Sequence, residues 1–381
     1  MKSTAILRQR VPGIVLVVLL LLSACGGDDE NGNGIKVNPP APPQPSTPAV
    51  AFVANQASNN VSAYAINRST GALVQAAGSP FPIGGTAPGG VVVSSDGTLA
   101  YVANQGSNNV SAFAVNASAG TLTSLGSPFP AGITPLRLAI SPNRSFLYVT
   151  NQGSNNVSAY AIGAAGGLTP VVGSPFPAGF TPAGVTCSPN GSFLYVANQG
   201  SNTVSAYNIN ASGQLSPVAG SPFAVGTTPV SLVVSPNGSF LYVTNQGSNY
   251  VSALAINGST GALTPVPGSP FTTGITPTGI TITPNGSFLY VANQSTNNVS
   301  AFTVDAATGA LAPLGVPMPA GTTPTAATVS PDGAVLYVAN QGSNDVFAYT
   351  INSASGGLTA VSGTPFPAGV TPRAIATPGR P

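Results

Sequence analysis

The chain has 381 residues, of which nine are Lys or Arg and seven are Asp or Glu, so that only 4% of the residues are charged. Typical soluble domains carry about 25% charged residues. A net charge of +2 over this length is too weak to hold a phosphate backbone, which excludes nucleic acid as a partner. The chain has no His, which excludes every mechanism that needs an imidazole.

Residues 1–24 have the organisation of a secretion signal. Lys2, Arg8 and Arg10 form a basic start, and the apolar run that follows is shorter than the roughly 20 residues that span a bilayer. The segment ends in Leu22-Ser23-Ala24-Cys25, which resembles the lipobox of bacterial lipoproteins. The resemblance implies that Cys25 becomes the lipid-modified first residue of the mature chain; an ordinary signal peptide with a nearby Cys is the alternative.

Residues 25–48 form a linker between that anchor and the folded part. Six prolines lie close together here, at Pro39, Pro40, Pro42, Pro43, Pro45 and Pro48. Such a segment favours extended polyproline conformations and acts as a semi-rigid spacer. Gly26 stands where an Asp would signal retention in the inner membrane. We therefore expect lipid anchoring at the outer membrane of a bacterial envelope. The sequence does not distinguish the periplasmic face of that membrane from its outer face.

Residues 49–381 consist of one unit repeated seven times. The dipeptide Asn-Gln recurs every 47 to 49 residues, beginning at Asn55, Asn104, Asn151, Asn198, Asn245, Asn293 and Asn340. Each unit contains four short segments rich in Val, Ile, Leu, Tyr and Phe, separated by turn residues. Repeats of this length with four strands are typical of propeller blades. The sequence predicts an all-β fold, a seven-bladed β-propeller of four-stranded antiparallel blades.

The third unit illustrates the expected strands, which cover residues 136–140, 146–150, 157–162 and 168–174. The repeat region opens on the second strand of a unit, at Ala51 to Asn55, and the chain ends on a first strand, at Arg373 to Thr377. We expect these two segments to pair, which would close the ring and remove its open edges.

The motif Tyr-Val-Thr-Asn, at Tyr148 to Asn151 and Tyr242 to Asn245, resembles the YVTN β-propeller repeat family, and four other units carry Tyr-Val-Ala-Asn. The repeats also resemble the seven-bladed lactonase group, whose members are similar to 6-phosphogluconolactonase. That resemblance implies lactone chemistry at residues around the axial channel. Between residues 49 and 381, however, the chain has no His, Glu or Lys, so none of the family's His or Glu positions can be transferred. No catalytic residue, metal site or cofactor is expected.

Functional residues in near-identical repeats are best sought where one copy differs from the others. Arg137 occupies a position that is small in the other units, where blades converge on the axis, and Arg373 lies one position earlier in the last unit. Both could face one mouth of the channel and bind a carboxylate or phosphate, or they could be incidental changes at an exposed rim. At the position of Arg137, the other units carry Gly90, Gly184, Ser231, Gly279, Ala326 and Ala374.

Two further differences lie in the turn that follows the Asn-Gln dipeptide. Tyr250 and Asp345 replace the Asn or Thr of the other units and are candidate contacts for a partner, or neutral surface changes. The amide-rich turns themselves could bind a glycan, but Asn and Gly there also satisfy the backbone of a tight turn. Cys187 replaces Val, Ile or Ala and is expected to be a buried apolar substitute.

We expect a lipid-anchored, monomeric binding module that takes an envelope protein, a glycan or a small molecule through the face bearing the Asn-Gln turns and Arg137. One alternative is a lactonase-like hydrolase that uses Arg137 and Arg373. The other is a mainly structural surface protein, which the YVTN resemblance implies for some relatives.

Overall fold

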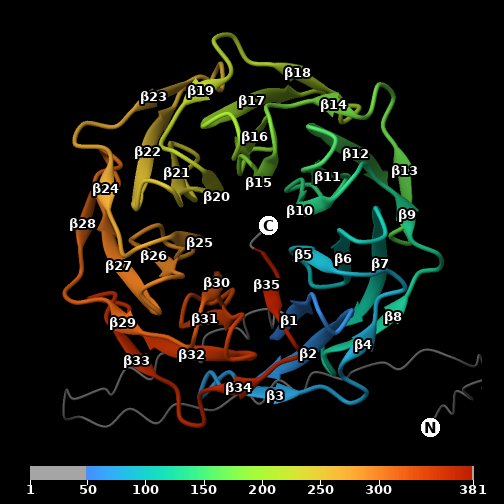
Figure 1. Cartoon of the computed structure of the whole chain (residues 1–381), viewed down its shortest axis with the longest axis vertical. Coiled ribbons are helices and arrows are strands. Elements are labelled where there is room, and N and C mark those ends of the chain that lie inside the picture. Colours follow the sequence, from blue (N-terminus) through green and yellow to red (C-terminus); the bar gives the residue numbers. More distant parts are fainter. Residues whose placement is uncertain (1–48, 380–381) are drawn as a thin grey trace, which may run out of the picture. The chain divides into compact units, whose positions relative to one another are not determined.

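The computed structural model describes residues 49–379, which form seven five-stranded antiparallel sheets arranged around a central axis (Figure 1). The predicted seven-bladed propeller is therefore confirmed. We number the blades from the N-terminus, so that blade 1 contains the first described strand and blade 7 the last complete unit. The signal peptide, the lipid attachment at Cys25 and the linker, all predicted for residues 1–48, lie outside the described residues.

Each blade runs outward from the axis through four consecutive strands and carries a fifth, two-residue strand on the third. The first strands, in blades 2 to 7 and then blade 1, are β5 (Pro88–Val93), β10 (Pro135–Ile140), β15 (Pro182–Cys187), β20 (Pro229–Val234), β25 (Pro277–Ile282), β30 (Pro324–Val329) and β35 (Pro372–Ala376). The second strands, in blades 1 to 7, are β1 (Val50–Asn55), β6 (Leu99–Asn104), β11 (Phe146–Asn151), β16 (Phe193–Asn198), β21 (Phe240–Asn245), β26 (Phe288–Asn293) and β31 (Val335–Asn340).

The outer strands follow the same order from blade 1 to blade 7. The third strands are β2 (Asn60–Ile66), β7 (Asn109–Asn116), β12 (Asn156–Ile162), β17 (Thr203–Ile209), β22 (Tyr250–Ile256), β27 (Asn298–Val304) and β32 (Asp345–Ile351). The fourth strands are β3 (Leu73–Gln75), β8 (Thr121–Ser124), β13 (Leu168–Pro170), β18 (Leu215–Pro217), β23 (Leu263–Pro265), β28 (Leu311–Pro313) and β33 (Leu358–Ala360). The fifth are β4 (Phe81–Pro82), β9 (Phe129–Pro130), β14 (Phe176–Pro177), β19 (Phe223–Ala224), β24 (Phe271–Thr272), β29 (Met318–Pro319) and β34 (Phe366–Pro367).

The ring closes through the two ends of the repeat region. Strand β35 pairs antiparallel with β1, placing Phe52 opposite Ala376 and Val53 opposite Ile375. This is the pairing expected from the sequence. Because β35 supplies the first strand of blade 1, the chain's last strand completes its first blade, and every described blade has the same five strands.

The fourth strand is shorter than the sequence predicts. In blade 3 it ends at Pro170 instead of Ser174, and the chain returns as β14 to pair with a different part of β12. Gly173 adopts a left-handed φ of 86° in the turn between them, and the hydroxyl of Ser174 accepts a hydrogen bond from the amide of Ala159 at 2.9 Å. The Gly-Ser-Pro motif therefore forms a turn that packs against the third strand. This turn ends the fourth strand earlier than the sequence predicts.

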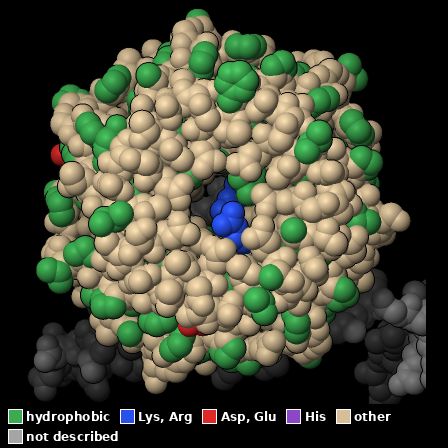
Figure 2. Space-filling view, viewed as in Figure 1, with side chains coloured by type: hydrophobic (Ala, Val, Ile, Leu, Met, Phe, Trp, Pro, Cys, Tyr) green, Lys and Arg blue, Asp and Glu red, His purple; other side chains and the backbone are tan. Residues whose placement is uncertain are grey.

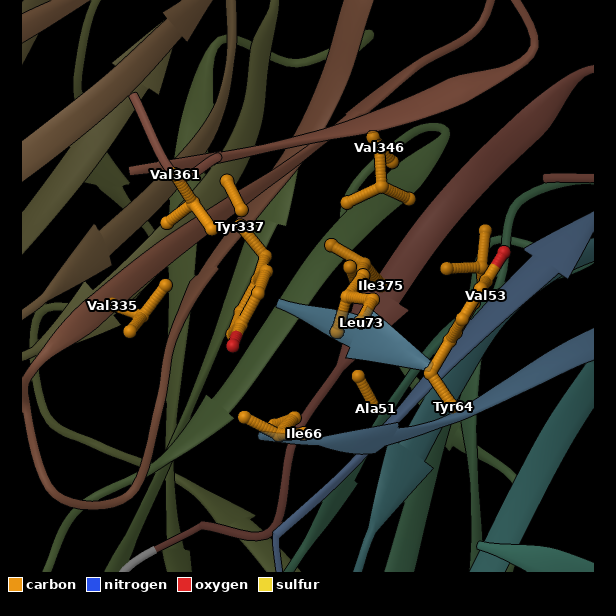
Figure 3. Close-up of a cluster of buried hydrophobic side chains, with 12 residues drawn as sticks. Ala51, Val53, Tyr64, Ile66, Leu73, Val335, Tyr337, Val346, Val361 and Ile375 are labelled. Carbon is orange, nitrogen blue, oxygen red and sulfur yellow. The ribbon is translucent and has the colours of Figure 1, made fainter. Parts of the chain in front are cut away.

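The buried hydrophobic side chains form seven clusters, each shared by two neighbouring blades. Figure 3 shows the one between blades 7 and 1, where Tyr337 and Val335 of β31 pack toward Ala51, Val53 and Ile375. Strand β16 is buried along its whole length because both of its faces contact other blades. Stability therefore resides in the interfaces between blades.

A tyrosine of the second strand adds a buried hydrogen bond to six of these interfaces. The phenol of Tyr195, for example, donates to the carbonyl of Gly261 in the next blade at 3.2 Å. Equivalent bonds are made by Tyr101, Tyr148, Tyr242, Tyr290 and Tyr337. Blade 1 carries Phe52 at this position, fully buried, so the interface between blades 1 and 2 lacks the bond.

This difference predicts opposite effects for two substitutions. Tyr195→Phe should lower the free energy of unfolding by about 1 to 2 kcal/mol, because it leaves a buried carbonyl without its donor. Phe52→Tyr should raise it by roughly 0.5 to 1.5 kcal/mol, because it supplies the seventh bond. Chemical denaturation of both variants beside the wild type measures the two shifts; a stabilised Tyr195→Phe variant would contradict this account of the interfaces.

Candidate functional site

The Asn of each Asn-Gln dipeptide is fully buried and holds its blade together. In blade 3 the side-chain amide of Asn151 donates to Asn156 Oδ1 at 2.7 Å and to Ser158 Oγ at 2.9 Å, both on the neighbouring strand. Its carbonyl oxygen accepts from the amide of Gly132 at 3.1 Å, in the loop that leads into the blade. A Cβ on Gly132 would lie 2.6 Å from Asn151 Cγ, so glycine is required there.

A second Asn of the same turn links each blade to the loop that enters the next one. Asn155 adopts a left-handed φ of 54°, and its Oδ1 accepts a hydrogen bond from the amide of Thr181 at 2.7 Å. The same bond recurs from Asn59, Asn108, Asn202, Asn249, Asn297 and Asn344. These two asparagines per unit are thus used in the architecture, although the buried Oδ1 atoms of Asn104, Asn245, Asn293 and Asn340 accept no hydrogen bond.

The Gln of each dipeptide lies on the same face but is partly exposed around the axis. Three neighbouring pairs are hydrogen bonded through their side chains: Gln56 donates to Gln105 at 2.9 Å, Gln152 to Gln199 at 3.0 Å and Gln246 to Gln294 at 3.2 Å. Gln341 belongs to none of these pairs. The sequence marked the whole turn as polar but gave no sign that its Asn and Gln point to different environments.

Arg137 and Arg373, which the sequence singled out, lie together at this end of the axis. Arg137 extends from β10, and its guanidinium donates to the carbonyl of Gly89 through Nη1 and to the carbonyl of Arg373 through Nη2, the latter at 3.2 Å. Arg373 extends from β35, and its Nε is buried without a hydrogen-bond partner. Figure 2 shows Lys and Arg side chains inside the axial opening and Asp and Glu side chains only toward the outer edge of this face.

The surroundings of these arginines disfavour their charge. Burial, and secondarily the charge of Arg373, lowers the pKa of Arg137 to about 10, and burial also lowers the pKa of Arg373. Arg137 therefore still carries a proton at neutral pH. The hydrogen-bond partners of the Arg137 guanidinium are backbone carbonyls, which do not neutralise its charge. By contrast, the surface residue Arg144 forms an ion pair with Asp96.

We call the cavity that these arginines line the arginine mouth. It has a volume of about 200 Å³ and contains no acidic or imidazole side chain among its lining residues. Its polar lining is made of Arg137, Arg373, Gln152, Gln199, Gln246, Gln294, Ser231, Thr278 and Thr325. Partly buried donors without a carboxylate suit a bound anion, or the oxygen of a carbonyl that gains negative charge.

Tyr250 and Asp345 are not brought to this cavity. Each begins the third strand of its blade, where the backbone carbonyl of Tyr250 accepts from Asn245 at 3.3 Å and the carboxylate of Asp345 accepts from Asn340 at 2.8 Å. Both therefore sit beside the structural asparagines. Their role as partner contacts stays a prediction.

The opposite end of the axis holds a larger cavity of about 570 Å³, lined mainly by aliphatic side chains and prolines. The last described residues, Thr377 to Gly379, line it, and so does Cys187. Cys187 is partly exposed rather than fully buried, because the axis leaves a cavity beside β15. Loss of solvent around the thiol, even with the residue partly exposed, raises its pKa to about 12, so that it remains protonated and unreactive at neutral pH.

Within residues 49–379, no group of three or more His, Cys, Asp or Glu side chains is arranged to hold a metal ion. No helix in this part of the chain has the length and hydropathy needed to cross a membrane.

Solved structures with the same fold include a putative 6-phosphogluconolactonase of Bacteroides fragilis, with a TM-score of 0.76 and 22% identity over 87% of this chain and 99% of that one. A putative 6-phosphogluconolactonase of Bacteroides uniformis gives a TM-score of 0.75 and 21% identity over 86% and 98%. The periplasmic gluconolactonase of Pseudomonas aeruginosa gives 0.73 and 20% over 86% and 98%. No curated protein matches the sequence.

Identities at this level demonstrate a shared fold and leave the activity open. The sequence itself matches the family described as "Lactonase, 7-bladed beta-propeller" over residues 47–179, 169–274 and 266–376. Together these ranges span nearly all of the repeat region. The chain therefore belongs to the seven-bladed β-propeller lactonase family.

Proposed function

We propose that this protein is a lactonase-type hydrolase that takes a sugar lactone at the arginine mouth. One observation carries the proposal: two partly buried arginines line the same axial opening with no carboxylate among the residues that line it. Family membership supports the choice of a lactone, and the Pseudomonas aeruginosa neighbour is described as a gluconolactonase. The proposal replaces our first expectation of a pure binding module, because the family points to lactone chemistry.

Hydrolysis at this site would proceed by attack of water on the lactone carbonyl carbon. The carbonyl π electrons move onto oxygen, where a guanidinium N–H stabilises the oxyanion. The carbonyl then re-forms as the bond to the ring oxygen breaks, and the ring oxygen takes up a proton that the attacking water has released. The product acid loses a second proton to solvent, so that its carboxylate remains beside the arginines. Removing one such donor typically costs about 10²- to 10³-fold in rate.

No lining residue can act as a strong general base. The proposed reaction therefore relies on stabilising the oxyanion, and solvent relays the proton of the attacking water to the ring oxygen. The same observation favours a second candidate function, in which the arginine mouth binds the sugar acid or lactone without turnover.

Substitution of the mouth arginines tests the proposal. Arg137→Gln should lower kcat/KM for δ-gluconolactone by about 10²-fold, since it removes a donor to the oxyanion. Arg144→Gln removes a surface arginine paired with Asp96 and should leave kcat/KM unchanged. Proton release above the spontaneous rate, followed in a pH-stat, is the measurement. Wild-type protein that binds gluconate but gives no such excess would support the binding function instead.

The lowered pKa of Arg137 predicts how binding depends on pH. Gluconate is an anion throughout the range, so its affinity should be constant from pH 7 to 9 and fall as pH rises through about 10, where Arg137 loses its proton. An ordinary arginine would remain charged there. Calorimetric titration at each pH measures the affinity, and circular dichroism checks the fold. Affinity that is unchanged at pH 11 would contradict the lowered pKa of Arg137.

We further propose that Cys25 carries a lipid that holds the protein at the bacterial envelope. Ala49, the first described residue, precedes the second strand of blade 1, which starts at the face opposite the arginine mouth. Labelling with radioactive palmitate should mark the wild type and not Cys25→Ala; equal labelling of both would exclude Cys25 as the attachment site.

A further inference from the structure

The polar lining of the arginine mouth differs from one side of the axis to the other. Arg137 comes from blade 3 and Arg373 from blade 1, and Arg137 hydrogen bonds to the carbonyl of Gly89 in blade 2. The guanidiniums therefore occupy the side of the mouth formed by blades 1 to 3. In a ring of seven blades, the side opposite blade 2 is formed by blades 5 and 6.

Blades 5 and 6 contribute uncharged hydrogen-bonding groups. Gln246 and Gln294 line the cavity and are joined by a hydrogen bond of 3.2 Å between their side chains. That bond uses one of the two N–H groups of Gln246 and one lone pair of Gln294, so each carboxamide retains donors and acceptors for a ligand. Ser231, the blade 5 residue at the position of Arg137, adds a hydroxyl to the same side.

We infer that Gln246 and Gln294 determine specificity by binding the hydroxyl groups of a ligand whose carboxyl or lactone end lies at Arg137 and Arg373. The inference rests on the proposed function and specifies it: the ligand is a polyhydroxylated acid or its lactone that reaches across the axis. Carboxamides suit this task because one side chain can donate to one hydroxyl and accept from another. A ligand with an acid group alone would use only the arginine side.

The ring contains a matched control for this pair. Gln56 and Gln105, in blades 1 and 2, are joined by the same type of hydrogen bond at 2.9 Å and belong to the same repeat position. Neither lines the arginine mouth, whose opening lies on the other side of the arginines. Replacing either pair by leucines therefore removes one carboxamide hydrogen bond between neighbouring blades. Only the replacement of Gln246 and Gln294 changes the lining of the cavity.

Calorimetric titration of the purified protein with D-gluconate and hexanoate tests the inference, because the two anions share a six-carbon chain and differ in hydroxyl groups. The wild type should bind gluconate at least tenfold more tightly than hexanoate. Gln246→Leu/Gln294→Leu should weaken gluconate binding about tenfold, the equivalent of about 1.4 kcal/mol, and leave hexanoate binding unchanged. Gln56→Leu/Gln105→Leu should change neither affinity. Thermal melts confirm that both variants are folded.

Two results would overturn the inference alone: equal binding of gluconate and hexanoate by the wild type, or equal losses in the two double variants. In both cases carboxylate binding that is abolished by Arg137→Gln would leave the arginine site standing. If the wild type binds neither anion, the proposed function fails and the inference fails with it. The pattern of results therefore separates the two claims.

Discussion

Every blade of this propeller buries its faces only against its two neighbours, and the rest of the structure depends on that contact. The seven hydrophobic clusters each span one interface, and tyrosine hydroxyls bridge six of them. A linear array would leave two blade faces exposed to water. Pairing of β35 with β1 removes those ends, so that the last strand of the chain is required for the burial of the first blade.

The same convergence of blades explains why two arginines can form a site. Near the start of the first strands, neighbouring backbones approach so closely that a Cβ on Gly279 would lie 2.6 Å from Ala326 Cα. Most blades must therefore place a small residue there, which leaves a narrow opening on the axis. An arginine at this position has room only within the opening, where Arg137 and Arg373 meet from blades that are not adjacent. Closing the ring through β35 and β1 therefore brings Arg373 to the same opening as Arg137.

Much of this arrangement could be predicted from the sequence because the repeats act as internal comparisons. The spacing of Asn-Gln dipeptides indicated seven blades, and the departure of Arg137 from small residues indicated the mouth. The inner strands gave no such guidance on orientation. Strand β16 is buried on both faces, so it lacks the alternation of polar and apolar residues that shows which side chains point inward. The different environments of Asn198 and Gln199 follow from that three-dimensional packing and not from a local pattern.

The near absence of other charges gives the two arginines their significance. A carboxylate beside them would lower the free-energy cost of burying their charge, but it would also cancel the attraction for an anion. Backbone carbonyls solvate the guanidinium of Arg137 without cancelling its charge. Its burial lowers its pKa to about 10, at which the guanidinium remains protonated at neutral pH. The lining contains Gln, Ser and Thr and no acidic side chain. The positive charge is therefore available to a ligand and is not paired with a carboxylate of the protein.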